Sequence, residues 1–124
     1  MTDLSSFRAV GQAPMDGRVK PYVPSRSPCP IGRASRVLGD RWVLLILREA
    51  FLGVDRFEEF LERLGISRAT LTARLAWMVD AGVLERVPPD AKYARYRLTD
   101  SGRALAPVVE ALRDWGEAHL PRAG

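Results

Sequence analysis

Cysteine, histidine and long apolar runs are all scarce in this chain. Cys29 and His119 are the only residues of their kinds among 124, which excludes an internal disulfide and a metal site of Cys/His spacing. A single cysteine fits a reducing compartment, so we expect a cytoplasmic protein. The longest apolar run, Trp42 to Leu47, is too short to span a membrane, and we expect no signal peptide.

The residue groupings that catalysis needs are absent too. No glycine-rich phosphate loop occurs, and the sole histidine lies far in sequence from the sole cysteine. Glu58, Glu59 and Glu62 fall on one expected helix, where carboxylates are ordinarily solvated. We therefore expect neither an enzyme nor a cofactor.

Positive charge is in modest excess and unevenly placed. Nineteen Lys and Arg against fifteen Asp and Glu give a net charge of +4 and a pI near 9.8, which favours a polyanionic partner. Residues 55–63 hold four acids and two arginines, whereas residues 86–97 hold four cations and only Asp90 as an acid. Positive charge is therefore concentrated in the second segment.

Length and composition indicate one domain preceded by an arm. With 47% hydrophobic residues, the chain can bury one core but not two. Gly and Pro recur in residues 1–28 without periodicity, so we expect a flexible arm there, a domain over residues 29–120 and a tail over 121–124. The arm holds four cations against two acids. It would touch a phosphate backbone or a partner subunit, or it would only be solvated.

Three helices are expected in the first half of the domain. Pro30 suits the first turn of a helix that reaches Leu38. From Arg41 to Leu52 the sequence is apolar nearly all round, as in a helix buried at the centre of a fold. Phe57 to Leu64 has apolar residues at helical spacing, and Gly65 follows at once.

The segment GISRATLTARLAWMVDAG, residues 65–82, predicts an amphipathic helix with a thin outer face. Leu71, Leu75 and Met78 form one apolar stripe, Ser67 can cap the start, and the closing glycine can end the helix in a left-handed conformation. The other face bears small, hydroxyl-bearing and cationic side chains, which suit a DNA groove. An alanine-rich core helix is the alternative. The candidate DNA-binding residues are Ser67, Arg68, Ala69, Thr70, Thr72, Ala73 and Arg74.

The order of elements in this region is that of a winged helix-turn-helix. A helix, a glycine turn and a second helix with a cationic face form the motif whose second helix enters the major groove. Strands over residues 83–87 and 95–99 then predict a hairpin with a basic tip. An ordinary solvated hairpin explains the alternation but not the gathered cations. The candidate DNA contacts of this wing are Lys92, Arg95 and Arg97.

A last helix is expected after Thr99, which can cap it. Pro107 should kink this helix, because it removes a backbone donor and crowds the preceding turn. A small domain offers little core for the long apolar stripe of this helix to cover. We therefore expect the stripe to pack partly against a second subunit in a homodimer. Folding back on its own domain is the alternative. The stripe consists of Leu105, Val108, Leu112 and Trp115.

Five parts of the sequence together point to one known family: Cys29-Pro30, GDRWVLLILREAFLG, RFEEFLERLGISRATLTARLAWMVDAGVLER, YRLTDSG and the Leu112 to Trp115 region. They resemble the HxlR-type winged helix-turn-helix transcriptional regulators of bacteria and archaea. The resemblance implies a mainly α fold with a small β-hairpin, completed by N- and C-terminal dimerisation helices. It also implies a homodimeric regulator on double-stranded DNA, which we expect to be a repressor. The long arm departs from the family.

Two alternatives to a plain DNA-binding regulator remain. Some family members respond to electrophiles or oxidants through the cysteine that matches Cys29, and a helix N-terminus with Arg33 one turn on favours the thiolate. Without a second cysteine, a disulfide would need another subunit or a small thiol, and a packing residue is the simpler interpretation. The other alternative, a protein-binding winged helix, requires an exposed apolar patch on the second helix of the motif. The sequence identifies no effector.

Overall fold

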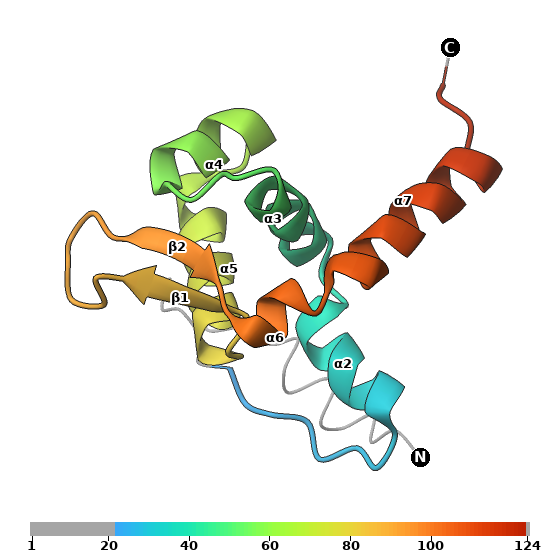
Figure 1. Cartoon of the computed structure of the whole chain (residues 1–124), viewed down its shortest axis with the longest axis horizontal. Helices are drawn as coiled ribbons and strands as arrows, with labels where there is room; N and C mark the ends of the chain where they lie inside the picture. The colour runs from blue at the N-terminus through green and yellow to red at the C-terminus, as the bar shows by residue number, and fades with distance from the viewer. Residues whose placement is uncertain (1–21, 124) are drawn as a thin grey trace.

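The computed structural model describes residues 22–123, which form six helices and one two-stranded sheet (Figure 1). This confirms the expected mainly α fold with a small β-hairpin. The elements are α2 (Pro30–Leu38), α3 (Arg41–Phe51), α4 (Phe57–Leu64), α5 (Arg68–Asp80), β1 (Leu84–Val87), β2 (Arg95–Leu98), α6 (Asp100–Arg103) and α7 (Ala106–His119).

Helix α3 lies at the centre of the fold, as its sequence predicts. It packs against α2, α4, α5 and the start of α7. Side chains from four elements meet in one core, and burying each large apolar side chain contributes roughly 1.5–3 kcal/mol to folding. The largest fully buried side chains are Val43, Ile46, Leu47, Phe60, Leu71, Leu75, Met78 and Leu84.

The turn between α4 and α5 sets the geometry of the helix-turn-helix. Gly65 ends α4 with φ of 62°, a left-handed conformation that favours glycine. Ile66 then enters the core, and Ser67 caps α5 by accepting a hydrogen bond from the backbone N–H of Thr70. At the other end of α5, Gly82 also has a positive φ, of 82°. The predicted start and end of this helix are therefore confirmed.

The hairpin is joined to the helices at both of its strands. Leu84 pairs with Leu98 in an antiparallel register, and the buried Leu84 brings β1 onto the core. On the other edge, the backbone N–H of Tyr96 donates to the Asp55 carbonyl at 2.7 Å. The loop between α3 and α4 thus supports β2.

The C-terminal region differs from the single kinked helix that the sequence predicts. Thr99 does cap a helix, since its hydroxyl accepts from Gly102 N–H, but this helix, α6, ends at Arg103. A separate helix, α7, then begins, with Pro107 in its first turn. Proline costs no hydrogen bond at that position. Pro107 therefore marks the start of a helix instead of a kink within one.

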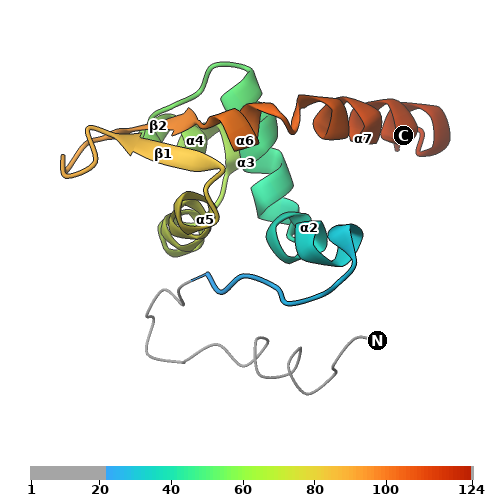
Figure 2. The ribbon, with the colours of Figure 1, turned by 60° about the horizontal axis from the view of Figure 1, so that its bottom comes forward.

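Helix α7 and the hairpin leave the helical body in opposite directions (Figures 1 and 2). Leu105 and Val109 pack against the core at the root of α7. On another side of α7, Val108, Leu112 and Trp115 are 41%, 47% and 57% exposed. Leu105, expected at a dimer interface, is thus partly covered by its own domain, whereas the rest of the stripe lies open.

Only the last part of the expected N-terminal arm, residues 22–28, falls within the described residues, and it packs on the domain. Tyr22 meets the ring of Trp77 on α5 edge-on, with centroids 4.9 Å apart. Arg36 of α2 donates to the Val23 carbonyl at 3.0 Å, and its guanidinium lies over Trp77. This packing differs from the expectation that the whole arm stands apart. Residues 1–21 lie outside the described part of the chain.

Candidate nucleic-acid interface

The outward face of α5 is thin and bears hydroxyl groups. Ala69 and Thr72 are exposed, and Thr70 and Ala73 are partly buried beside them. The Ser67 hydroxyl, besides capping the helix, donates to Thr70 Oγ1 at 2.8 Å. Short side chains of this kind let a helix backbone approach a base edge closely. These sequence-predicted residues therefore lie together on one side of the first turns of α5.

Arg68, also predicted as a DNA contact, is held by an acid from the preceding helix. Its Nη1 and Nη2 donate to Glu58 Oε1 and Oε2 at 2.9 and 3.0 Å, and its guanidinium lies over the Phe57 ring. The hydrogen bond from Arg68 lowers the pKa of the Glu58 carboxyl and raises the pKa of the guanidinium. Both side chains are exposed, at 63% and 70%. The cation is therefore accessible but not free.

Arg74 has a different setting on the same helix. Its Nε donates to Asp40 Oδ2 at 3.0 Å, and the same oxygen accepts the backbone N–H of Val43 at 3.1 Å. Asp40 is the N-cap of α3, and both partners are only 35% exposed. Arg74 thus ties α5 to the start of the central helix α3.

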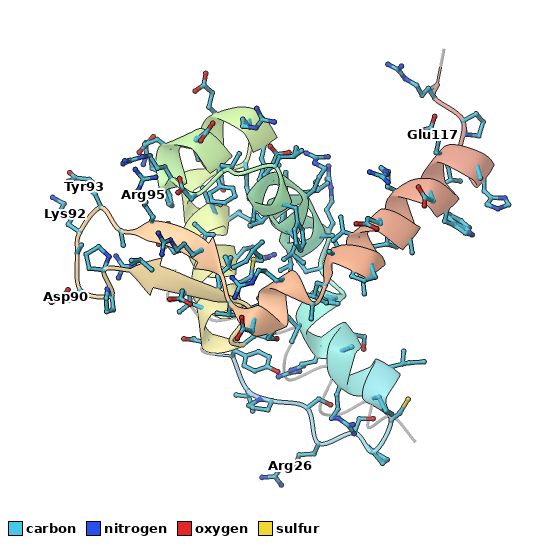
Figure 3. All side chains as sticks on the ribbon, viewed as in Figure 1. Arg26, Asp90, Lys92, Tyr93, Arg95 and Glu117 are labelled. Carbon is cyan, nitrogen blue, oxygen red and sulfur yellow. The ribbon has the colours of Figure 1, made fainter. Side chains whose placement is uncertain are left out.

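The exposed side chains at the hairpin tip include one cation, Lys92, one acid, Asp90, and one aromatic, Tyr93. Figure 3 shows Lys92 and Tyr93 at the tip, with Arg95 nearer the helical body. Arg95 Nη1 donates to Asp55 Oδ2 at 2.8 Å. Arg97 is exposed and lies opposite Glu85 in the strand register. The three predicted wing cations therefore share one hairpin, although one of them is paired.

Arg86 does not belong to the outward charge of the wing. Its Nη1 and Nη2 donate to the carbonyls of Pro89 and Ala91 at 3.2 and 2.6 Å, so the side chain closes the hairpin loop from inside. The sequence places Arg86 among four hairpin cations. In the strand register Arg86 pairs with Tyr96, between Arg95 and Arg97. Its position on a different face of the hairpin is the only feature of the pattern that could have distinguished its role from theirs.

A buried carboxylate, that of Glu49, joins α3 to α4, and sequence reasoning did not single it out. The Glu49 side chain is almost fully buried and is paired with Arg48 at 2.9 Å and with Arg63. Burial raises the pKa of Glu49, but hydrogen bonds and charges from the two arginines outweigh burial and leave that pKa below its usual value. Because α4 precedes the turn, this pairing helps to fix the position of the helix-turn-helix. Its one sequence signal is an acid inside an apolar helix.

Cys29 is the N-cap residue of α2 and its side chain is exposed. Its backbone N–H donates to the Ser27 hydroxyl at 3.2 Å, and Arg33 Nη1 donates to the Ser27 carbonyl at 2.9 Å. Arg33 thus holds the loop before α2, a role that the sequence pattern does not indicate. The exposed thiol therefore stands at the end of a loop that hydrogen bonds fix in place.

The described residues contain neither a membrane-spanning helix nor a cluster of metal-binding side chains. Between residues 22 and 123 no helix is both long and apolar enough to cross a membrane. The same residues contain no cluster of His, Cys, Asp and Glu that could hold a metal ion.

A helix-turn-helix followed by a two-stranded wing defines the winged-helix class of DNA-binding proteins. The family model of HxlR-like helix-turn-helix proteins matches residues 37–123, and the chain belongs to this family of transcriptional regulators. The resemblance seen in the sequence is thereby confirmed.

Relatives in several bacteria are described as HTH-type transcriptional regulators. Over 94 residues the chain is 48% identical to an uncharacterised HTH-type transcriptional regulator of Mycobacterium tuberculosis, covering 74% of this chain and 60% of that protein. It thus spans less than two thirds of the length of this relative. Over 100 residues it is 33% identical to the uncharacterised HTH-type regulator YdeP of Bacillus subtilis, with 76% of each chain covered.

Solved structures share the fold. PA1607, a candidate transcription factor, superposes with a TM-score of 0.74 at 43% identity over 80% of this chain and 72% of its own. The redox regulator HypR in its reduced form gives 0.66 at 29% identity over 75% and 95%. The reduced regulator YodB of B. subtilis gives 0.63 at 28% identity over 79% and 100%.

Proposed function

We propose that this chain is a sequence-specific DNA-binding repressor that acts as a homodimer. Helix α5 would enter the major groove, and the hairpin would contact the phosphate backbone or the minor groove. The observation that carries the proposal is the chemistry of the α5 face. Among residues 22–123, none of the exposed large hydrophobic side chains lies on α5, so the face suits a DNA groove better than an apolar protein partner.

The residues divide into two expected roles. Ala69, Thr70 and Ala73 are expected nearest the base edges, because they are short and lie on the thin face of α5. The phosphate contacts are expected from the accessible cations around that face, which position the protein without reading sequence. These cations are Arg68, Lys92, Arg95 and Arg97.

The salt dependence of binding tests the wing. The operator is first identified by sequencing genomic fragments that the purified protein retains. Replacing Lys92 and Arg95 together by Ala should weaken binding to operator and unrelated duplex alike. The slope of log affinity against log salt should flatten by about 0.9 for each phosphate that the variant no longer neutralises.

The matched control removes two cations far from the wing. Arg113→Ala with Arg122→Ala takes the same charge from exposed positions in α7 and the tail, and its salt slope should stay that of the wild type. A wing variant with an unchanged slope would show that the hairpin does not touch the backbone.

A second candidate function is sensing of oxidants or electrophiles through Cys29. It is favoured by the exposure of the Cys29 thiol and by the likeness to HypR, which is known in reduced and oxidised forms. As the only cysteine of the chain, Cys29 could form a disulfide only with another subunit or a small thiol.

Treatment with an oxidant or a quinone tests this second candidate. Wild-type protein should change its operator affinity after treatment, because the thiolate is the group that reacts. Cys29→Ser should bind the operator with the same affinity before and after. Equal responses of the two proteins would leave Cys29 as a structural residue and point to a non-covalent effector.

A further inference from the structure

We propose that Glu58 is an intramolecular competitor of DNA for Arg68, so that the guanidinium leaves the carboxylate for a DNA phosphate when the protein binds. The inference rests on the proposed DNA-binding function. It assigns Glu58, on the first helix of the motif, a part in setting affinity that its position in the sequence does not suggest.

The geometry of the pair is that of phosphate recognition. Both terminal nitrogens of Arg68 bind both oxygens of Glu58, at 2.9 and 3.0 Å. This paired arrangement is the one by which arginine binds a carboxylate or a phosphate. Arg68 is the first residue of α5, and the N-terminal residues of a recognition helix are those that reach the DNA. The acid therefore occupies the guanidinium at the position where a phosphate would arrive.

The pair is also easily opened. Arg68 and Glu58 are 63% and 70% exposed, and an ion pair so open to water contributes little net stability. Glu58 stands in the first turn of α4, where the helix dipole favours negative charge and would favour a phosphate equally. Glutamate carboxyls are ionised at neutral pH, and the hydrogen bond from Arg68 lowers the pKa of Glu58 further, so the competing charge is present.

Arg74, the other predicted DNA contact among the arginines of α5, cannot readily exchange its carboxylate partner for a phosphate. Its partner Asp40 also caps α3 through the Val43 N–H, and the two side chains are only 35% exposed. Moving Arg74 to a phosphate would leave Asp40 without its charged partner at the start of the central helix. Of the two arginines on α5, we therefore assign Arg74 to positioning the helix and Arg68 to partner exchange.

The variant Glu58→Gln tests the exchange on the full chain, with operator and unrelated duplex as the probes. At low salt it should bind both more tightly than wild type. Each additional phosphate contact should add about a three- to fourfold loss of affinity between 50 and 200 mM salt. The control Glu62→Gln removes the same charge one turn further along α4, from an exposed side chain, and gives the effect of net charge alone.

A double-mutant cycle locates the effect on Arg68. In an Arg68→Ala background, Glu58→Gln should change affinity no more than Glu62→Gln does, because the cation to be released is gone. Thermal unfolding of each variant confirms that it is folded. Equal effects of Glu58→Gln and Glu62→Gln, or weaker binding by Glu58→Gln, would overturn the exchange. Wild-type protein without salt-dependent DNA binding would instead overturn the proposed function itself.

Discussion

Leu112→Lys is expected to convert the proposed dimer into a monomer and to lower operator affinity by about a hundredfold or more, the usual gain from linked sites. Leu112 lies between Val108 and Trp115 on the open side of α7, and the three line one shallow apolar depression. A lysine there would bury an unpaired charge in a dimer interface. Because Leu112 is 47% exposed in the single chain, the fold of the domain should survive.

Sedimentation at micromolar concentration measures whether the variant is a monomer or a dimer. The control Glu117→Lys changes the charge of α7 by more than Leu112→Lys does. Figure 3 labels Glu117 near the end of α7, and its helical spacing from Leu112 puts it on another face. It should remain dimeric. Two recognition helices in such a dimer would read half-sites one helical turn, roughly 34 Å, or a multiple apart. A wild-type protein that sediments only as a 13.8 kDa species would contradict the dimer.

Gly102→Ala is expected to destabilise the domain by about 3 kcal/mol, at the upper end for overpacking. Gly102 is buried in α6 against the start of the hairpin, and a Cβ there would overlap the Val83 carbonyl oxygen. The same oxygen accepts the Thr99 N–H at 3.1 Å, so it cannot move without loss of that bond. The expected fall in the melting temperature is about 10–20 °C.

Gly116→Ala is the matched control for this substitution. Gly116 lies in α7, and nothing stands within 4 Å of where its Cβ would be. Alanine favours a helix over glycine by up to about 1 kcal/mol, so the melting temperature should stay the same or rise slightly. Similar losses from both substitutions would show that the close approach of α6 to Val83 is not the cause.

The elements of the helix-turn-helix could be predicted because their signals are local. Apolar residues three and four apart placed Leu71, Leu75 and Met78 in the core, and these side chains are buried. Caps such as Ser67 act within a single turn, so the start of α5 was readable as well. The same short range misled the prediction at Pro107, because a proline inside a long apolar pattern and a proline at the start of a new helix look alike.

Local patterns in the sequence were enough to predict the family, the order of elements as far as the hairpin, and the thin face of α5. Which cations are held by acids depends on the three-dimensional fold. Arg68, Arg74 and Arg95 meet partners 10, 34 and 40 residues away in the chain. The three-dimensional fold also places Leu105 against the core of its own domain and leaves Leu112 exposed. Caps and periodicity act within a turn or two, whereas ion pairs and exposed stripes depend on how distant segments are brought together.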